Sequence, residues 1–495
     1  MPYMYWLDGS DHPGSRLSMA RGQQNEPQGR YVIRLLPFMV NLKSAAVWAG
    51  AIALSAVLFV YSLPPANLGF LGLFALVPIL KVVRGRGFLV GFVTSLAMVF
   101  AAAKLAESGW ASKLTWDGGT LGWLYTGFGL FGFAISLTVA VYADVSRRRE
   151  PSMVTIAGLA VLFEACLLLV LPAHLALTQY EHPFAMTVAS IGGVWLVSWL
   201  LWVLQLKLAS LTWPRSILAC ALLAGCWLIT AGLQFKVGGS TAQVGMVQTE
   251  AIDLETLSHL HKWTGKNQVA IWPEFSALAI AHEGDTTDLR KLSLESSPII
   301  TTFRDAAKPL PHNVAAMFSD GNESAPYFKR KLFGSEREMH AAGVQSTQVS
   351  WRFGIIGLNI CYDSCFPGII RDTASNPAVN LIALPTIDPP SPHHFIAAIH
   401  AAYTTFRCAE NGVSIVRVDG AAYSMAVDGR GHIVTRIHPG ERATSTPVPT
   451  ERIKTVYALL GDWVLYLAPV SILIAALEAK KPHPKAGLKL YETSR

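Results

Sequence analysis

Three side chains that together could carry out nucleophilic acyl transfer are spread over the second half of the chain. They are Glu274, Lys329 and Cys361. A thiol is a poor nucleophile until it is deprotonated, so a carboxylate within hydrogen-bonding reach can accept its proton, and a nearby ammonium favours the negative charge that develops. Each residue alone is a weak signal, because Cys361 could be a buried structural cysteine and the other two could be solvated surface charges.

The elements predicted around these side chains give each a suitable position. The apolar, β-branched run 353–360 predicts a buried strand that ends at Cys361, and a sharp turn before Pro367 would expose the thiol. Glu274 directly follows a second predicted strand and a proline in the sequence IWPEFSA, which suits a rigidly held carboxylate. Lys329 lies at the end of a short Tyr-x-Lys sequence.

The region that contains these residues has the pattern of an α/β domain. A helical pattern at 394–410 ends in FRCAENG, residues 406–412, and leads into another strand. The predicted strands lie at 242–248, 267–272, 297–303, 313–318, 353–360, 379–385, 412–418 and 423–437. The sequence therefore predicts an α/β domain with a core of its own.

The whole chain is too apolar for an ordinary globular enzyme and too charged in its second half for a pure membrane bundle. It has 495 residues, of which 52% are hydrophobic and 15% are charged. The net charge of +7 comes from short basic clusters beside apolar runs, which is typical of membrane topology signals rather than of nucleic-acid binding. Runs that approach the length needed to cross ~30 Å of hydrocarbon lie at 45–63, 67–83, 87–103, 121–143, 152–172, 185–206, 216–235 and 456–477.

The basic clusters predict how these runs are oriented. They precede the first run and follow the second, fourth, sixth and eighth, so all lie on one face, which the positive-inside rule makes cytoplasmic. The clusters are Arg30, Arg34 and Lys43; Lys81, Arg84 and Arg86; Arg147, Arg148 and Arg149; Lys207 and Arg215; and Lys480, Lys481, Lys485 and Lys489. The predicted domains are a cytoplasmic tail (1–44), seven transmembrane helices (45–235), an external catalytic domain (236–455), a closing transmembrane helix (456–477) and a second cytoplasmic tail (478–495).

The motifs around the three side chains resemble those of the nitrilase superfamily, in which Glu, Lys and Cys form a triad in this chain order. CYDSCFP is similar to the nucleophile motif of that superfamily, WPE to its glutamate motif and RCAENG to its following helix. Over about 40–477 the chain resembles the apolipoprotein N-acyltransferase family, the membrane-embedded branch. LPPANLGFLGLFALVPIL, ASIGGVWLVSWLL and TVYALLGDW are similar to the membrane segments of this branch and to the entry to its final helix.

The resemblance implies a bacterial inner-membrane enzyme without a cofactor, with a four-layer αββα domain in the periplasm. Glu274 would be the base, and Cys361 would attack a phospholipid ester to form a thioester. Lys329 and a backbone N–H after Cys361 would stabilise the oxyanion. The α-amine of the S-diacylglyceryl cysteine of an apolipoprotein would then take the acyl group. Glu336 is the candidate second glutamate, and Asp363 stands where this branch usually has Glu.

Two alternatives remain open from the sequence. A membrane-tethered amidase would use the same triad to hydrolyse a carbon-nitrogen bond, and water instead of an amine would resolve the acyl-enzyme. A noncatalytic envelope protein could retain the fold, although the intact Glu274, Lys329 and Cys361 argue against it. The fate of the acyl group separates the two enzymes.

Two features within the apolar runs have structural interpretations as well as functional ones. GFGLFG, residues 127–132, has the glycine spacing of a dinucleotide site, but it lies inside an apolar run without a preceding strand, which favours close helix packing. Glu164 lies within the fifth run, where a carboxylate is costly, and either a structural hydrogen bond or a substrate contact would explain it.

The remaining histidines and cysteines of the second half give no metal motif. His393, His394 and His400 have neither HExxH spacing nor a cysteine pair beside them, so the sequence predicts no metal site. A disulfide involving Cys365 or Cys408 is possible in an oxidising compartment, but Cys361 must stay free to act as a nucleophile, and packing in the core is the default expectation for the other two.

Overall fold

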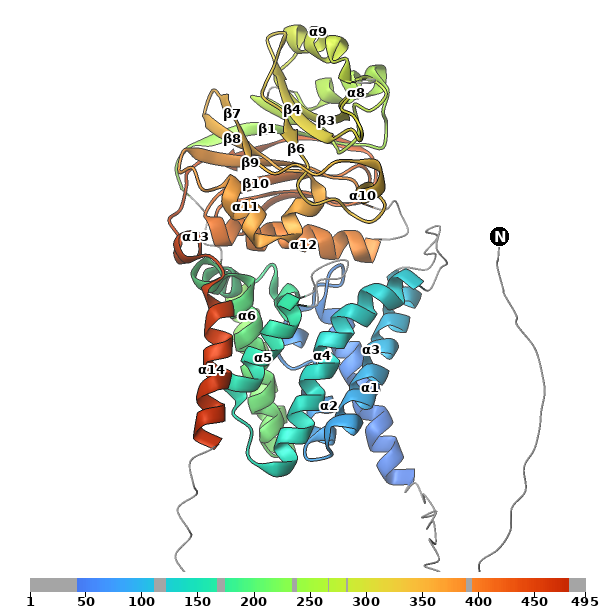
Figure 1. Ribbon diagram of the computed structural model, residues 1–495, viewed down its shortest axis with the longest axis vertical. Helices are drawn as coiled ribbons and strands as arrows, with labels where there is room; N and C mark the ends of the chain where they lie inside the picture. Colours follow the sequence, from blue (N-terminus) through green and yellow to red (C-terminus); the bar gives the residue numbers. More distant parts are fainter. Residues whose placement is uncertain are drawn as a thin grey trace, which may run out of the picture.

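The structure, a computed structural model, places an α/β domain on one end of a helical bundle (Figure 1). It describes residues 42–110, 122–166, 174–233, 238–265, 267–281, 284–388 and 394–479. The bundle is formed by helices of the first half of the chain and by its last helices, and the α/β domain by the region between them.

The bundle consists of apolar helices with short 3₁₀ and α-helical turns between them. The long helices are α1 (Leu42–Ser62), α3 (Phe88–Trp110), α4 (Gly122–Arg148), α5 (Met153–Cys166), α6 (Pro183–Ser210), α7 (Trp213–Ala231) and α14 (Trp463–Ala479). The short turns are η1 (Gly69–Leu73), α2 (Val77–Val83), η2 (Leu175–Gln179) and α13 (Val456–Leu460). Four of the described helices, α1, α3, α6 and α7, are long and apolar enough to cross a membrane. The predicted number of eight spans stays a prediction.

Three of the predicted apolar runs differ from single helices. The run 67–83 is divided into η1 and α2, because Pro78, which lacks an N–H, starts a new helix at its first turn. The run 456–477 is divided into α13 and α14 by Gly461, whose φ of +66° ends the first helix. In the run 152–172, α5 ends at Cys166, and the last six positions lie outside the described residues.

The described basic clusters gather at the end of the bundle that points away from the α/β domain (Figure 1). Lys81 donates through Nζ to the carbonyl of Leu211, just beyond α6. Arg84 forms an ion pair of 2.8 Å with Glu150, just beyond α4. These contacts bring together the clusters that follow the second, fourth and sixth runs.

The α/β domain contains two sheets that lie face to face. The first has the order β13-β1-β2-β3-β4-β5, with β6 also paired to β4, and the second has the order β12-β11-β10-β9-β8-β7. The strands are β1 (Thr241–Gln248), β2 (Val269–Ile271), β3 (Ile299–Arg304), β4 (Asn313–Ser319), β5 (Asn322–Glu323), β6 (Tyr327–Phe328), β7 (Thr347–Trp351), β8 (Gly354–Leu358), β9 (Val379–Pro385), β10 (Ser414–Val418), β11 (Ser424–Val427), β12 (Ile433–Ile437) and β13 (Arg442–Pro449). β1, β2 and β3 are parallel, as are β8, β9 and β10, so their carboxyl ends share one edge of each sheet.

Helices cover the outer faces of both sheets and complete four αββα layers. α8 (Leu254–Trp263) and α9 (Thr287–Glu295) pack on the first sheet, where Leu257 and Leu289 join its buried core. α11 (Pro367–Thr373) and α12 (His394–Asn411) pack on the second sheet, where Ile370 and Cys408 join another buried cluster. A short helix, α10 (Glu336–Met339), lies beside the edge where the strands end.

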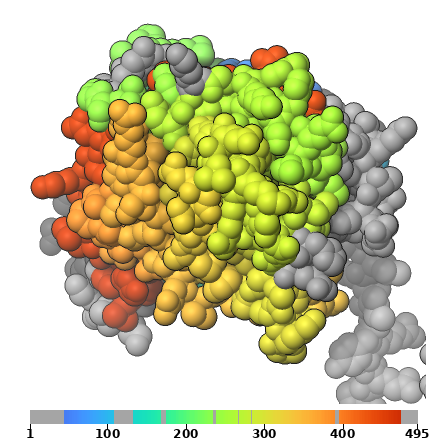
Figure 2. Space-filling model, turned by 90° about the horizontal axis from the view of Figure 1, so that it is seen from above, coloured from blue at the N-terminus to red at the C-terminus, as the bar shows by residue number. Residues whose placement is uncertain are grey.

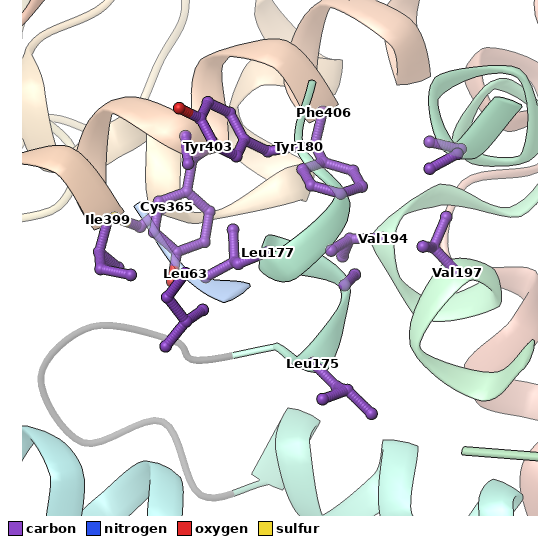
Figure 3. Close-up of a cluster of buried hydrophobic side chains, with 14 of the residues drawn as sticks. Leu63, Leu175, Leu177, Tyr180, Val194, Val197, Cys365, Ile399, Tyr403 and Phe406 are labelled. Atoms are coloured by element: carbon purple, nitrogen blue, oxygen red, sulfur yellow. The ribbon is translucent and has the colours of Figure 1, made fainter. Parts of the chain in front are cut away.

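The helix α12 joins the α/β domain to the bundle. Two opposite faces of the helix are apolar, and one packs on the sheet while the other packs on the bundle. Ala401 and Cys408 face the sheet, whereas Ile399, Tyr403 and Phe406 belong to the cluster that includes the bundle. Figure 3 shows these bundle-facing side chains together with Leu175, Leu177, Val194 and Val197. Viewed from above, the α/β domain covers most of the bundle (Figure 2). The sheet that carries Cys361 is therefore separated from the bundle by the helix α12, whereas Glu274 and Lys329 follow strands of the other sheet.

Candidate active site

Cys361 lies at the carboxyl end of β8, where the sequence predicts the nucleophile. Its backbone has a φ of +48°, a left-handed conformation that is uncommon for a residue other than glycine. The following residues form a 3₁₀ turn, Cys361–Cys365, instead of continuing the strand. The side chain is 6% exposed, so the turn presents the thiol to an enclosed site rather than to open solvent.

Asp363 holds this turn in register with the segment that carries Lys329. Its Oδ2 accepts hydrogen bonds from Tyr327 Oη at 2.7 Å and from the backbone N–H of Ile360 at 3.0 Å. Its Oδ1 accepts from the backbone N–H of Lys331 at 2.9 Å. Because Tyr327 and Lys331 stand two residues before and two after Lys329, a single buried carboxylate fixes the lysine segment against the cysteine turn. The structure thus gives the predicted accessory residue a positioning contact.

Glu274 follows β2 on the facing sheet and is held from three directions. Its Oε1 accepts hydrogen bonds from Lys329 Nζ at 2.8 Å and from Asn313 Nδ2 at 2.7 Å. Its Oε2 accepts from the backbone N–H of Ile387, beyond β9, at 3.1 Å. The side chain is 2% exposed. A buried carboxylate with this many donors has a fixed orientation, which suits a general base.

Lys329 is buried between two carboxylates. Besides the contact with Glu274, its Nζ donates to Glu336 Oε1 at 2.9 Å and to Glu336 Oε2 at 2.7 Å. Glu336 also accepts from the backbone N–H of Phe333 at 2.7 Å. Asn313 Nδ2 bridges the two carboxylates, because it donates to Glu274 Oε1 at 2.7 Å and to Glu336 Oε1 at 3.3 Å. The structure therefore brings together Glu274, Lys329 and Glu336.

The charges of the site shift the pKa of all three candidate catalytic residues. Burial raises the pKa of Glu274, although the Lys329 ammonium and hydrogen bonds from Lys329 and Cys361 oppose that rise. Burial lowers the pKa of Lys329, but Glu274, Cys361 and Glu336 outweigh it and hold this pKa well above its usual value. Burial and the Glu274 carboxylate raise the pKa of the Cys361 thiol well above its ordinary value. The resting thiol is therefore protonated at neutral pH and needs a base.

A second polar network supports the Cys361 turn from the side of α12. His400 Nδ1 lies 2.7 Å from Asp388 Oδ1, and His400 Nε2 lies 3.1 Å from Ser364 Oγ. Ser364 Oγ in turn donates to the carbonyl of Cys361 at 2.9 Å. The guanidinium of Arg417, which is fully buried, donates to Asp388. No role for Asp388, Arg417 or Asn313 is predicted from the sequence, although the charge of Arg417 inside the apolar strand GVSIVRV indicates a buried anionic partner.

The ligand-type atoms of Cys361, Asp388 and His400 lie within 4.8 Å of one another. The Asp388 carboxylate already contacts both His400 and the Arg417 guanidinium. The positive charge of that guanidinium would repel a metal ion placed beside it. The geometry therefore favours a hydrogen-bonded network here. Of the other histidines considered, His393 lies outside the described residues, and the side chain of His394 is not among those described.

The other singled-out residues have packing or hydrogen-bonding roles. Cys365 and Cys408 are buried free thiols, as expected for packing cysteines. Gly132 lies so close to α3 that an added Cβ would fall 2.0 Å from a methyl of Val99, which confirms close helix packing at this glycine. Glu164 Oε1 accepts from Trp202 Nε1 at 3.0 Å and from the backbone N–H of Leu175 at 3.3 Å. These contacts favour the structural interpretation of Glu164.

Comparisons with known proteins agree with the division of the chain. Residues 55–207 match the family described as apolipoprotein N-acyltransferase N-terminal domain, and residues 246–454 match the carbon-nitrogen hydrolase family. The chain is 25% identical over 456 residues to an apolipoprotein N-acyltransferase of Geobacter metallireducens, a match that covers 77% of this chain and 85% of that protein. It is 33% identical over 129 residues to an apolipoprotein N-acyltransferase of Chlamydia trachomatis serovar D, covering 24% of this chain and 23% of that protein.

Among solved structures, an amidase from Nesterenkonia sp. is similar to 44% of this chain and to 94% of its own length, with 18% sequence identity and a TM-score of 0.39. The carbon-nitrogen hydrolase match confirms the predicted nitrilase-like α/β domain. The two matched families follow one another in the same order as the helical bundle and the α/β domain. Together with the relatives, they show that the chain is similar to apolipoprotein N-acyltransferases in its first half and to carbon-nitrogen hydrolases in its second half.

Proposed function

We propose that this protein is a phospholipid:apolipoprotein N-acyltransferase that works through a thioester on Cys361. The observation that carries the proposal is the buried contact of Glu274 with Lys329 beside Cys361, in a domain that packs directly on a helical bundle. A membrane-spanning bundle beside the site suits substrates that are themselves anchored in lipid. The two family matches and the names of the relatives support the same reaction.

The first half of the reaction transfers the acyl group to the enzyme. Glu274 takes the proton of the Cys361 thiol while Sγ attacks the ester carbonyl of a phospholipid, forming a carbon-sulfur bond. The Lys329 ammonium and the backbone N–H after Cys361 stabilise the negative oxygen of the tetrahedral intermediate. When the carbon-oxygen ester bond breaks, Glu274 returns the proton to the leaving alkoxide. The products are a lysophospholipid and the acyl thioester.

The second half transfers the acyl group to an amine. The neutral α-amine of an S-diacylglyceryl cysteine attacks the thioester carbonyl, and a carbon-nitrogen bond replaces the carbon-sulfur bond. Glu274 removes a proton from the attacking amine and delivers it to the departing thiolate. The raised pKa of the Cys361 thiol makes reprotonation of the free enzyme favourable. The lysine keeps its charge through the cycle, since its pKa lies well above the usual value.

Aromatic side chains beside the cysteine provide apolar surface for an acyl chain. The ring of Tyr362 packs edge-on against Phe333, with centroids 5.0 Å apart, and against Phe366, also at 5.0 Å. Phe333 belongs to the segment that Glu336 and Lys329 organise, so the same segment supplies both charge and apolar contact. We propose that the chain next to the reacting carbonyl lies against these rings.

The proposal includes a location. The bundle would span the bacterial inner membrane with its basic end in the cytoplasm, both termini would be cytoplasmic, and the α/β domain would face the periplasm. The described basic clusters support this orientation, because they lie at the end of the bundle opposite the α/β domain (Figure 1).

The decisive test supplies phospholipid with a labelled acyl chain and a diacylglyceryl-cysteine peptide, and follows the label. Transfer to the peptide amine supports the N-acyltransferase. Release of labelled fatty acid at the same rate with and without the peptide would instead support a tethered hydrolase. A peptide whose α-amine is acetylated serves as the control acceptor, because it keeps the lipid anchor and removes the nucleophile.

A further inference from the structure

A cavity separate from the catalytic site lies at the junction between the bundle and the α/β domain. Its volume is about 610 Å³, within the range of roughly 300–1,000 Å³ typical of small-molecule sites. It is lined by the start of α6, the end of α7, the β11–β12 hairpin and the residues just before α13, with Ala409 of α12. The hairpin strand β12 lies four strands from β8, which places it roughly 19 Å from the strand that carries Cys361.

The cavity carries more positive than negative charge. Arg430, Arg436, Lys454 and Glu181 line it. Arg436 forms an ion pair with Glu181, so these two charges offset one another. Arg430 and Lys454 are exposed, and within the described part of the chain neither forms an ion pair. Two positive charges therefore face the cavity without a carboxylate to neutralise them.

Close packing fixes the hairpin against α6 of the bundle and α12 of the α/β domain. Gly431 has a φ of +80°, and an added Cβ would fall 2.7 Å from the sulfur of Met186 on α6 and 2.8 Å from the carbonyl oxygen of Thr405 on α12. The buried carboxylate of Asp428 accepts hydrogen bonds from the backbone N–H groups of Arg430 and His432 at 2.9 and 3.0 Å. The turn that bears Arg430 is thus rigidly placed rather than loosely exposed.

The cavity lies at the depth expected for lipid headgroups. Pro183 and Thr187 belong to the first turns of α6, and Ala231 ends α7, so two helices able to cross a membrane meet the cavity at one end. Large apolar side chains beside it point outward: Phe184 is 66% exposed and Ile229 is 76% exposed. Cationic side chains above an apolar surface match a molecule with an anionic head and acyl chains.

We propose that this cavity binds the headgroup of an anionic phospholipid, with the acyl chains lying along the exposed faces of α6 and α7. Arg430 and Lys454 contact the phosphate, and the hydroxyl groups of Thr187 and Thr435 are within the lining to contact the rest of the headgroup. This site is distinct from the one in which the acyl donor reacts. Binding of the headgroup makes the position of the α/β domain relative to the membrane depend on the charge of the membrane surface.

The test uses the full-length protein in nanodiscs that contain a phosphatidylglycerol with a photoreactive headgroup. After irradiation, peptide mapping by mass spectrometry should find the label on residues 429–438. With Arg430→Gln and Lys454→Gln combined, labelling at a limiting lipid concentration should fall about 25-fold, since each cation near an anionic surface contributes about a fivefold effect. The control combines Lys262→Gln and Arg352→Gln, which removes an exposed lysine and an exposed arginine remote from the membrane helices and should leave labelling unchanged.

Several outcomes would overturn the proposal. Unchanged labelling in the double variant would remove the two cations from the site, and an equal loss in the control would reduce the effect to general surface charge. Equal labelling by a photoreactive phosphatidylcholine would contradict selectivity for anionic lipid. If inorganic phosphate alone displaced the label at concentrations near those of the lipid, the site would bind phosphate rather than a lipid. Acyl transfer measured in parallel should be retained in the double variant, so failure of the proposed reaction would not be confused with failure of this site.

Discussion

Replacement of Lys329 by methionine tests how the buried charges of the site are balanced. The residue is 1% exposed, and its ammonium donates to Glu274 at 2.8 Å and to both oxygens of Glu336 at 2.9 and 2.7 Å. Methionine keeps most of the apolar stem but leaves two carboxylates without their cation. Removing one partner of a buried ion pair costs about 3–5 kcal/mol. For a domain of this size, that loss lowers the midpoint of thermal unfolding by roughly 6–20 °C.

The same replacement should slow acylation of Cys361 by about 100- to 1,000-fold, because it removes an oxyanion donor. Burial already raises the pKa of Glu274, and loss of the opposing Lys329 charge should raise it further. A carboxyl group with a raised pKa in the folded protein stabilises the fold at low pH and loses that contribution as the pH rises through this pKa. The stability deficit of the variant should therefore shrink as the pH falls from 8 to 5.

The assay combines thermal unfolding in detergent across that pH range with the rate of acyl-adduct formation. Lys331→Met is the matched control, because this neighbouring lysine is exposed and its side chain lies 4.9 Å from the ring of Phe366 rather than beside a carboxylate. A second variant, Lys329→Met with Glu336→Gln, should recover part of the lost stability, since it removes one of the two unpaired charges. A deficit that is independent of pH, or acylation at the rate of the unaltered protein, would refute this account of the site.

Three further predictions concern the base, the nucleophile and the joint between the two parts. Glu274→Gln should slow thioester formation about 100- to 10,000-fold while thermal unfolding stays cooperative, and an unaltered rate would remove it as the base. Cys361→Ala should abolish the acyl adduct in mass spectrometry, whereas Cys365→Ala, at a fully buried packing position, should retain it; equal loss from both would reject the assignment of the nucleophile. Gly193→Ala should lower stability by about 1–3 kcal/mol, because its φ is +69° and an added Cβ would fall 2.6 Å from an aromatic ring of α13. Gly50→Ala, with open space around it, is the control for thermal unfolding and should not lower the midpoint.

The strand ends that carry Glu274 and Cys361 could be predicted because they depend on local pattern. A buried strand is apolar without interruption, so the change to CYDS after β8 and to PEFS after β2 marks the point where each strand ends. The structure also explains the tyrosine of the Tyr-x-Lys sequence, because the Tyr327 hydroxyl donates to Asp363 and thereby fixes the segment that carries the lysine. Chemistry at the ends of strands thus leaves a recognisable signal in the sequence.

The supporting contacts could not be predicted in the same way, because they join segments that are distant in the chain. Asn313 reaches Glu274 from a strand 39 residues later, and Asp388 meets both Arg417 and His400 through the packing of β9, β10 and α12. Because the residues in contact are far apart in the chain, these contacts produce no short sequence motif. Arg417 was the available signal, since an arginine in a fully buried strand requires an anionic partner.

The strand β13 was missed for a different reason. Its sequence RATSTPVP contains two prolines, which argue against a central strand. In the structure β13 is at the edge of the first sheet, where Pro447 and Pro449 pair only with β1 and a missing N–H on the other side has no cost. The small and polar residues at the start of this segment are nevertheless compatible with an edge strand.

The most direct test of the central claim is the mass of the Cys361 peptide after the purified protein is incubated with a phospholipid of defined acyl chains. The account predicts an increase equal to one acyl group, absent in Cys361→Ala and strongly reduced in Glu274→Gln, which disappears when a diacylglyceryl-cysteine peptide is added and reappears on its α-amine. An unmodified Cys361 peptide under conditions where the acceptor peptide nevertheless becomes acylated would contradict the thioester mechanism.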